Sequence, residues 1–272
     1  MNQKTIPLLT EPDALATELG NPQLLIIDLS PQETYKAYHV PGATHIQYGV
    51  LTEKLPCTPG ALAEDAALQQ TLNQIGLTHH HHVIAYDDGD NSKACRLLWT
   101  LDLIGHKDYS LLNGGLQAWL DERHPVENQS ATPKAGNTPF ACSGESPQVD
   151  LLYILQHLGD ENTTLIDART AAEYRGEDRR AQRGGHIPGA IHLDHRQLLD
   201  PEHSYRLRPQ KQLKAIVKAA GISPKHELIV YCQTHRRSAL VYFVLKYLGF
   251  TNVKAYPGAW AEWGNNLDTP IE

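Results

Sequence analysis

One cysteine stands among cations where an apolar run passes into a helical pattern. Cys232 follows "LIVY" (Leu228–Tyr231), and the polar loop "CQTHRRS" leads into "ALVYFVLKYLG", whose apolar residues recur at helical spacing. Ligands of open parallel sheets bind at this edge, where strands end and helices begin. Unpaired N–H groups of a first helical turn, together with nearby arginines, stabilise a thiolate. We therefore predict that Cys232 is a nucleophile.

The alternative is a buried structural thiol that ends a strand. The loop argues against this reading, because Thr234, His235, Arg236 and Arg237 are residues that a hydrophobic core tolerates poorly.

The chain repeats itself. "HVPGA" at 39–43 matches "HIPGA" at 186–190, "HVIAYDDGDNSK" at 82–93 parallels "ELIVYCQTHRRS" at 227–238, and "NGGLQAW" at 113–119 parallels "PGAWAEW" at 257–263. The matches occur in the same order in both halves, at offsets of about 140 to 147 residues, which indicates a duplicated domain rather than a solenoid.

Within each copy, short apolar runs alternate with helical patterns, which predicts an α/β fold with a parallel sheet flanked by helices. The stretch before Pro147 is rich in Pro, Ser, Thr, Gly and Asn and is typical of a linker. We predict two tandem domains, 1–126 and 148–272, joined by a linker at 127–147.

The first copy serves as an internal control for the second. Asp87 stands where the second copy has Cys232, and "DDGDNSK" has no arginine. Residues 1–147 contain 8 Lys and Arg against 17 Asp and Glu, a balance of −9, whereas residues 148–272 contain 16 against 14, a balance of +2. We expect the first copy to be catalytically degenerate and the second to handle anions.

These motifs together resemble the tandem-domain rhodaneses, which are thiosulfate:cyanide sulfurtransferases. The resemblance rests on the paired H-[VI]-P-G-A segments, the C-x(4)-R loop and "YPGAWAEWG" (Tyr256–Gly264), and it covers roughly Pro7 to Pro270. The loop is similar to that of a bacterial thiosulfate:cyanide subgroup and differs from the C-G-[SA]-G-V-T loop of 3-mercaptopyruvate sulfurtransferases.

The resemblance implies a mechanism without a metal or an organic cofactor. The Cys232 thiolate takes the outer sulfur of thiosulfate, and the resulting persulfide passes it to cyanide or a thiol. The remaining loop residues would stabilise these anions with their N–H groups and cations: Gln233, Thr234, His235, Arg236, Arg237 and Ser238.

Other positions are matched to the family by residue. Asp167 and Arg169 correspond to an Asp-x-Arg pair that supports the active domain. Glu173 stands where mammalian members have a substrate-binding arginine, and Arg175 is a possible replacement at the rim of the site. His186 is expected to serve the fold, because the first copy retains it as His39.

Three other functions stay open. The first is a 3-mercaptopyruvate sulfurtransferase, and the second is a persulfide carrier or sensor. The third, a cysteine-dependent phosphatase, is less expected, because its C-x(5)-R loop would need an arginine at position 238, which is Ser238.

The remaining features favour an enzyme that acts without a membrane, a nucleic acid or a metal. No apolar run suggests a membrane span, the N-terminus lacks the pattern of a secretory signal, and no strong basic stripe suggests nucleic acid, so we expect a cytoplasmic protein. A duplicated domain can satisfy its own pseudo-dimeric interface, so we expect a monomer. Cys57, Cys95 and Cys142 form no CxxC pair and are expected to be bystanders. Successive side chains of a strand alternate in direction, so His79–His82 is interpreted as a solvated loop and not as a metal site.

Overall fold

The structure is a computed structural model that describes residues 6–53, 55, 58–131, 133, 135–136 and 146–272. The contacts between residues divide the chain into two compact units. Unit 1 contains the described residues of Met1–Leu51, Glu64–Cys142 and Asp200–Leu207, and unit 2 contains those of Thr52–Ala63, Ser143–Leu199 and Arg208–Glu272. Among the described residues, no helix is both long and apolar enough to cross a membrane.

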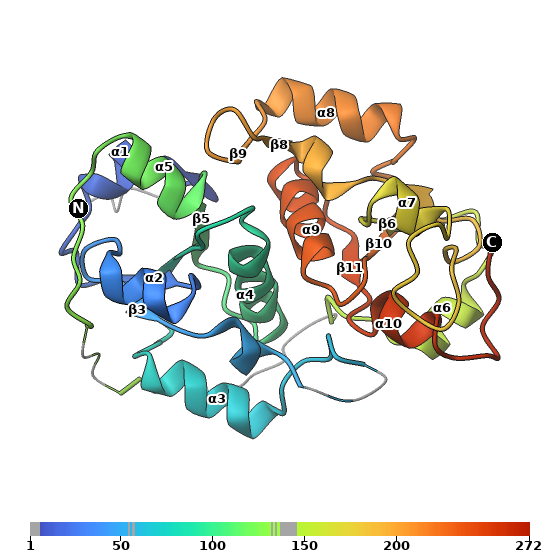
Figure 1. The fold of residues 1–272 in the computed structure, drawn as a ribbon, viewed down its shortest axis with the longest axis horizontal. Coiled ribbons are helices and arrows are strands. Elements are labelled where there is room, and N and C mark those ends of the chain that lie inside the picture. Colours follow the sequence, from blue (N-terminus) through green and yellow to red (C-terminus); the bar gives the residue numbers. More distant parts are fainter. Residues whose placement is uncertain (1–5, 54, 56–57, 132, 134, 137–145) are drawn as a thin grey trace. The chain divides into compact units, whose positions relative to one another are not determined.

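Unit 1 is built on a parallel sheet whose described strands have the order β1-β5-β4-β2-β3. Figure 1 labels two of these strands, β3 and β5. Its elements are β1 (Leu9–Thr10), α1 (Pro12–Ala16), β2 (Leu24–Asp28), α2 (Gln32–Ala37), β3 (Thr44–His45), the 3-10 helix η1 (Tyr48–Leu51), α3 (Asp65–Gln74), β4 (His82–Tyr86), α4 (Ser92–Leu103), β5 (Tyr109–Leu112), α5 (Gly115–Asp121) and β9 (Arg206–Leu207).

Unit 2 is built on a parallel sheet with the order β11-β10-β6-β7. Its elements are α6 (Leu151–Gln156), β6 (Thr163–Asp167), α7 (Ala171–Tyr174), β7 (Ile191–His192), the 3-10 helix η2 (His195–Leu198), α8 (Gln210–Ala219), β10 (Glu227–Tyr231), α9 (Arg237–Tyr247), β11 (Val253–Ala255) and α10 (Ala259–Trp263), while β8 (Leu199–Asp200) ends at the boundary and pairs with β9. The predicted α/β fold with parallel sheets and flanking helices is confirmed.

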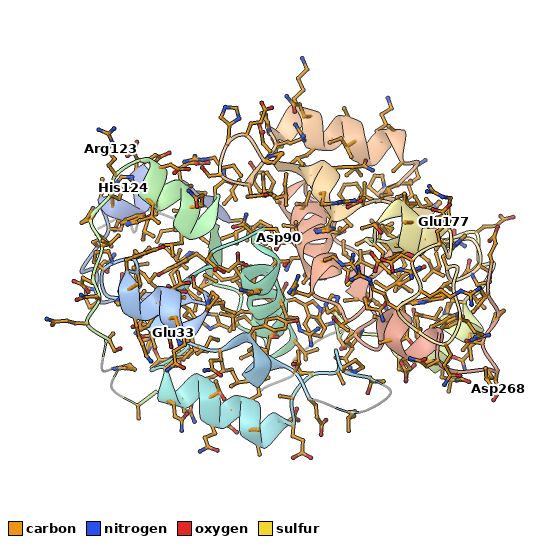
Figure 2. All side chains as sticks on the ribbon, in the orientation of Figure 1. Glu33, Asp90, Arg123, His124, Glu177 and Asp268 are labelled. Atoms are coloured by element: carbon orange, nitrogen blue, oxygen red, sulfur yellow. The ribbon has the colours of Figure 1, made fainter. Side chains whose placement is uncertain are left out.

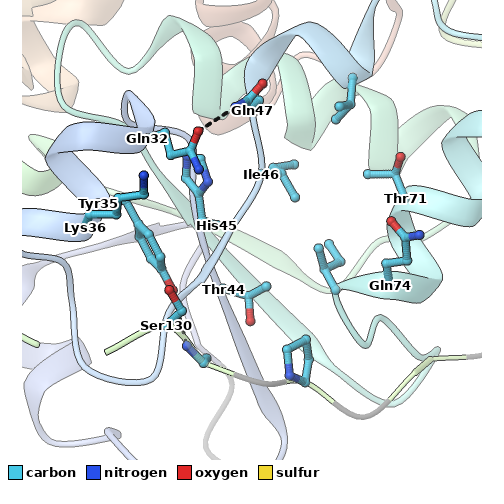
Figure 3. Close-up of a pocket in the computed structure, with 14 residues that line it drawn as sticks. Gln32, Tyr35, Lys36, Thr44, His45, Ile46, Gln47, Thr71, Gln74 and Ser130 are labelled. Carbon is cyan, nitrogen blue, oxygen red and sulfur yellow. Dashed lines mark hydrogen bonds between the residues drawn. The ribbon is translucent and has the colours of Figure 1, made fainter. Parts of the chain in front are cut away.

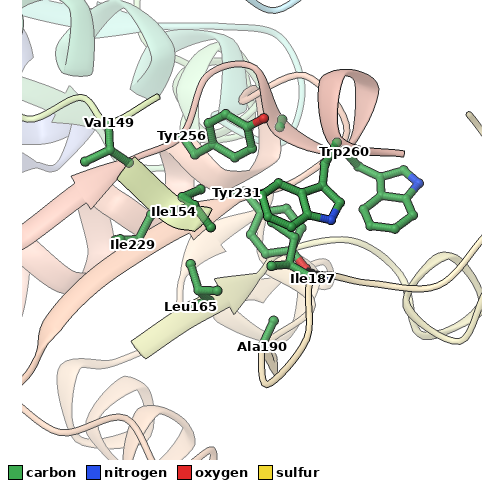
Figure 4. Packing of buried hydrophobic residues seen from close by; sticks show 11 residues of the cluster. Val149, Ile154, Leu165, Ile187, Ala190, Ile229, Tyr231, Tyr256 and Trp260 are labelled. Atoms are coloured by element: carbon green, nitrogen blue, oxygen red, sulfur yellow. Dashed lines mark hydrogen bonds between the residues drawn. The ribbon is translucent and has the colours of Figure 1, made fainter. Parts of the chain in front are cut away.

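The central strand of unit 2 is buried on both faces, which explains its continuous apolar run. Ile229 and Tyr231 point into a hydrophobic cluster with Trp260 and Trp263 of α10 (Figure 4). The alternate residues Leu228 and Val230 are also fully buried, and α9 packs against this strand. The strand therefore holds its last residue, and Cys232 after it, in fixed positions.

The two units repeat the same internal hydrogen bonds, as the duplicated sequence predicts. A tyrosine at the end of the central strand, a tyrosine of the H-[VI]-P-G-A region and a core tryptophan each bond the backbone in both copies. The pairs are Tyr86 with Val40 and Tyr231 with Ile187, Tyr35 with Ala43 and Tyr174 with Ala190, and Trp119 with Pro125 and Trp263 with Pro270.

Two segments pack in the unit formed mainly by the other copy. We call the described residues of Thr52–Ala63 (52–53, 55 and 58–63), which follow η1 and belong to unit 2, the first arm. Asp200–Leu207, which follows η2 and belongs to unit 1, is the second arm. The second arm is anchored by ion pairs of Arg206 with Glu11 and Glu122. The two arms follow η1 and η2, which are corresponding 3-10 helices. Segments at equivalent places in the two copies are therefore exchanged between the units.

The histidine run is only partly a solvated loop. His79 and His80 are exposed, but His82 begins β4 and its Nε2 lies 2.6 Å from Ser110 Oγ. His81 Nδ1 accepts a bond from the Thr78 N–H, which requires an unprotonated nitrogen. Burial lowers the pKa of His81, His82 and nearby His106.

The lowered histidine pKa values predict acid sensitivity of the fold. The unfolded chain takes up protons as the pH falls below about 6.5, while the folded histidines stay neutral until their lower pKa is reached. The free energy of unfolding should therefore be flat above that pH and fall below it. Urea unfolding at several pH values checks this, and His82→Gln should flatten the fall whereas the exposed control His79→Gln should not. A fall of the same steepness in both variants would contradict the assignment.

Candidate active site

The active-site loop, Cys232–Ser238, connects the end of β10 to the start of α9. The Cys232 side chain is nearly buried, with 1% of its surface exposed. The N–H groups of Trp260 and Ala261, in the first turn of α10, bond the carbonyls of Cys232 (2.9 Å) and Gln233 (3.0 Å). The first two peptide groups of the loop are thus fixed by a neighbouring helix.

His235 supports the loop from inside. Its side chain is buried, its φ of 52° lies in the left-handed region, and its Nδ1 is 2.8 Å from the hydroxyl oxygen of Ser238. The Ser238 hydroxyl bonds the Cys232 sulfur. If the hydroxyl donates to a thiolate, its oxygen must accept from His235, so Nδ1 carries the proton. His235 thus contacts Ser238, which in turn contacts the Cys232 sulfur.

The surroundings of Cys232 favour the thiolate. Burial by itself raises the pKa of the thiol, but the charge of Arg237, the Ser238 hydroxyl and the N–H groups of Ser238 and Thr234 outweigh it and lower that pKa. In unit 1, by contrast, burial and nearby carboxylates raise the pKa of the Cys95 thiol. Cys57 and Cys142 lie outside the described residues.

The cation beside Cys232 has a counter-ion that the sequence did not reveal. Arg237 donates two bonds to the Glu173 carboxylate, at 2.6 and 2.7 Å, and Glu173 is fully buried. Although burial raises the pKa of that carboxyl, its bonds to Arg237 and Thr170 lower it to about 2. The one local signal was the spacing of Thr170 and Glu173, which form a capping box at the start of α7.

The structure brings Arg180 to the loop, whereas Arg175 pairs elsewhere. The Arg175 guanidinium is 57% exposed and bonds Glu177, which Figure 2 labels among the surface side chains. The backbone carbonyl of Arg180 accepts a bond from the Gln233 side chain at 2.9 Å. Arg236 is exposed and occupies the N-cap position of α9, where its side chain makes no capping hydrogen bond.

Asp167 and Arg169 support the loop indirectly. Arg169 bonds both oxygens of Asp167 and, at 2.7 Å, the carbonyl of Gly185. Its guanidinium carbon lies 4.4 Å from the ring centroid of Trp260, whose N–H holds the Cys232 carbonyl. The pair therefore fixes α10, and α10 in turn fixes the loop.

His186 has the same surroundings as its counterpart in the first copy. The ring of His186 stacks on Tyr174 with centroids 3.6 Å apart, and the ring of His39 stacks on Tyr35 at 3.9 Å. In both cases Nδ1 lies within hydrogen-bond distance of the tyrosine carbonyl oxygen. The same arrangement in both copies is what we expect if His186 serves the fold rather than the reaction.

In the first copy, the N–H groups of the corresponding loop bind a carboxylate of the same loop. The Asp87 carboxylate is buried and accepts bonds at 2.8–3.1 Å from the N–H groups of Gly89, Asn91, Lys93 and Ala94. The donors that would hold a substrate anion there are used by the chain itself.

A hollow of about 420 Å³ in unit 1 lies elsewhere (Figure 3). It is lined by side chains such as Gln32 and Gln47, which bond each other at 3.2 Å. Its described lining includes hydroxyl groups, Lys36 and His45 but no cysteine, so we place the candidate site at Cys232.

Replacing Arg237 by alanine should affect both the thiol and the fold. The loss of its charge should raise the pKa of Cys232. The buried Glu173 would keep only its longer ion pair with Arg180, at 3.4 Å, so the free energy of unfolding should fall by about 3 kcal/mol. Alkylation rates of the Cys232 peptide against pH, together with urea unfolding, measure the two effects. The neighbouring exposed control, Arg236→Ala, should change neither, and equal effects of both substitutions would contradict the assignment.

The comparisons with known proteins agree on one family. The model of the rhodanese-like domain matches the chain twice, at residues 11–122 and 151–266. A thiosulfate sulfurtransferase of Pseudomonas aeruginosa is 36% identical over 267 residues, which cover 98% of this chain and 97% of that protein. The 3-mercaptopyruvate sulfurtransferase of Escherichia coli K12 is 30% identical over 273 residues, with 96% of each chain covered.

A solved structure shows the same fold. The anaerobic ergothioneine biosynthesis enzyme from Chlorobium limicola superimposes with a TM-score of 0.83 at 24% identity, over 97% of this chain and 70% of that one. The two matched domains and the relative at 36% identity show the family: the chain belongs to the rhodanese family and contains two rhodanese-like domains in tandem.

Proposed function

We propose that the protein is a thiosulfate sulfurtransferase that moves the outer sulfur of thiosulfate to cyanide or a thiol through a persulfide on Cys232. The observation that carries the proposal is the buried Cys232 thiol with a lowered pKa, held by Arg237, Ser238 and the loop N–H groups. The name of the Pseudomonas aeruginosa relative supports thiosulfate as the donor.

In the first step the Cys232 thiolate attacks the outer sulfur of thiosulfate. A new S–S bond forms, the S–S bond of thiosulfate breaks, and sulfite leaves with the electron pair. The persulfide anion keeps the negative charge that the thiolate had, so the same N–H groups and the same cation stabilise the site before and after transfer.

In the second step cyanide, or a thiol acting as thiolate, attacks the outer sulfur of the persulfide. The S–S bond breaks toward Cys232, which leaves as the thiolate, while the acceptor carries the sulfur away. No net proton is consumed when cyanide is the acceptor, so the loop needs anion stabilisation rather than a general acid.

The two arginines of the loop have different roles. Arg237 is shared between Cys232 and Glu173, so its charge serves mainly to hold the anionic sulfur. Arg236 is exposed beside it and is suited to attract the thiosulfate dianion. His235, Thr234, Gln233 and Ser238 shape the loop.

The first copy is proposed to be catalytically degenerate. Asp87 cannot accept sulfur, and its carboxylate uses the N–H groups of its own loop. We further propose that the catalytic domain is 148–272 and the degenerate domain 1–126.

Removal of the nucleophile tests the proposal directly. Cys232→Ala should abolish thiocyanate formation from thiosulfate and cyanide without unfolding the protein, while Cys95→Ala, the buried control in the first copy, should retain activity in any folded preparation. The same preparations are assayed for hydrolysis of an aryl phosphate. Phosphate release without thiocyanate formation would overturn the proposal in favour of a phosphatase.

The role of Arg236 predicts a change in substrate affinity. Arg236→Ala should raise the KM for thiosulfate by about tenfold, because a charge-assisted contact to the dianion is lost. Steady-state kinetics check this. Arg175→Ala is the matched control, since that guanidinium pairs with Glu177. An unchanged KM in Arg236→Ala, or an equal rise in Arg175→Ala, would refute the assignment.

A further inference from the structure

The first arm touches the active-site loop at a glycine. Gly60 is buried, and a methyl group built on it would lie 2.7 Å from the Cα and 2.6 Å from the carbonyl carbon of Thr234, overlapping the carbonyl oxygen as well. These neighbours are backbone atoms, which cannot turn aside as a side chain can. Only glycine therefore permits this approach of the two backbones.

The arm is built to present that glycine. Thr52 and Leu62 form an antiparallel bridge, the Glu53 N–H donates to the Ala61 carbonyl at 3.0 Å, and the Ala61 N–H donates to the Thr58 carbonyl at 2.8 Å. The two sides of the arm are thus tied together, and Gly60 lies in the turn between them.

The contact completes the support of the loop. Helix α10 bonds the carbonyls of Cys232 and Gln233, and the next carbonyl along the chain, that of Thr234, faces Gly60. The N–H of Thr234 is one of the groups that bond the Cys232 sulfur, and the next residue, His235, is held in the left-handed region. The peptide groups around Thr234 thus need a fixed position.

The second arm also packs on a loop, but through different contacts. The second arm packs on the corresponding loop of unit 1, where the Asn91 side chain bonds the Tyr205 carbonyl at 2.9 Å. A methyl group at Gly114 would lie 3.0 Å from the Ser204 carbonyl oxygen, so this arm also approaches glycine closely.

We propose that the first arm, through Gly60, is a positioning element of the active site: it fixes the peptide groups of Thr234 that hold the sulfur of Cys232. This rests on the proposed function for its place in sulfur transfer, but the positioning itself acts on the thiol. The arm comes from the copy that lacks the nucleophile, which gives that copy a part in the reaction.

The test is made on the full chain with Gly60→Ala. Displacement of Thr234 should raise the midpoint pH of iodoacetamide alkylation of the Cys232 peptide by about one unit, because a hydrogen bond to a charged group is weakened. The kcat for thiosulfate and cyanide should fall by about tenfold with little change in KM. Gly49→Ala is the matched control, because a methyl group there meets nothing within 4 Å.

A second variant covers the case in which Gly60→Ala does not fold. Ala61→Pro removes the N–H that closes the turn and leaves residue 60 a glycine, so it should shift the midpoint in the same direction. An unchanged midpoint in a folded arm variant overturns the proposal. Loss of folding in both also overturns it, because a positioning element is dispensable for folding.

The alkylation profile separates this proposal from the proposed function. If the unsubstituted chain forms no thiocyanate but the alkylation midpoint still shifts in Gly60→Ala, the positioning role of the first arm is supported and the sulfurtransferase proposal is contradicted. If the unsubstituted chain forms thiocyanate but the alkylation midpoint does not shift in Gly60→Ala, the sulfurtransferase proposal is supported and the positioning role of the first arm is contradicted.

Discussion

The structure of unit 2 is organised around one constraint, which is that a sulfur anion must be stable where water is excluded. Cys232 is almost fully buried, and burial alone opposes ionisation of its thiol. Fixed N–H groups, the Ser238 hydroxyl and the Arg237 charge compensate for the lost water. Arg237, whose side chain is 12% exposed, is neutralised by the buried Glu173, so the thiolate, the guanidinium and the carboxylate form one interdependent set.

The first copy also holds a buried anionic group at this place in the fold, but the group is of a different kind. Both copies place a loop between the central strand and the following helix, and both turn N–H groups toward an anion. In the first copy this anion is the carboxylate of Asp87, which is covalently part of the loop and cannot be exchanged. In the second it is the sulfur of Cys232, which we propose gains and loses a second sulfur. The arms show that the copies have stayed interdependent, because each contributes a segment to the unit of the other.

Much of this could be predicted from the sequence, because the decisive signals are local or repeated. The apolar run before Cys232, the helix after it and the matching order of motifs fixed the parallel sheets and the duplication. Glu173 could not be predicted as the partner of Arg237, because the pair joins residues 64 positions apart and depends on how α7 packs beside α9. Arg175 was predicted for the rim from its charge, whereas Arg180 contacts the loop through its backbone carbonyl, a contact that side-chain type does not reveal. Gly60 gave no signal, because the requirement for glycine arises only from a backbone far away in the chain.

The central claim is that Cys232, and no other cysteine, carries the transferred sulfur. It is tested most directly by mass spectrometry of the intact protein and its peptides after incubation with thiosulfate. The account predicts the added mass of one sulfur atom on the peptide that contains Cys232, its removal by cyanide, and none on the peptide of Cys95. A sulfur adduct that persists in Cys232→Ala, or unmodified Cys232 under conditions in which thiocyanate is produced, would contradict the account.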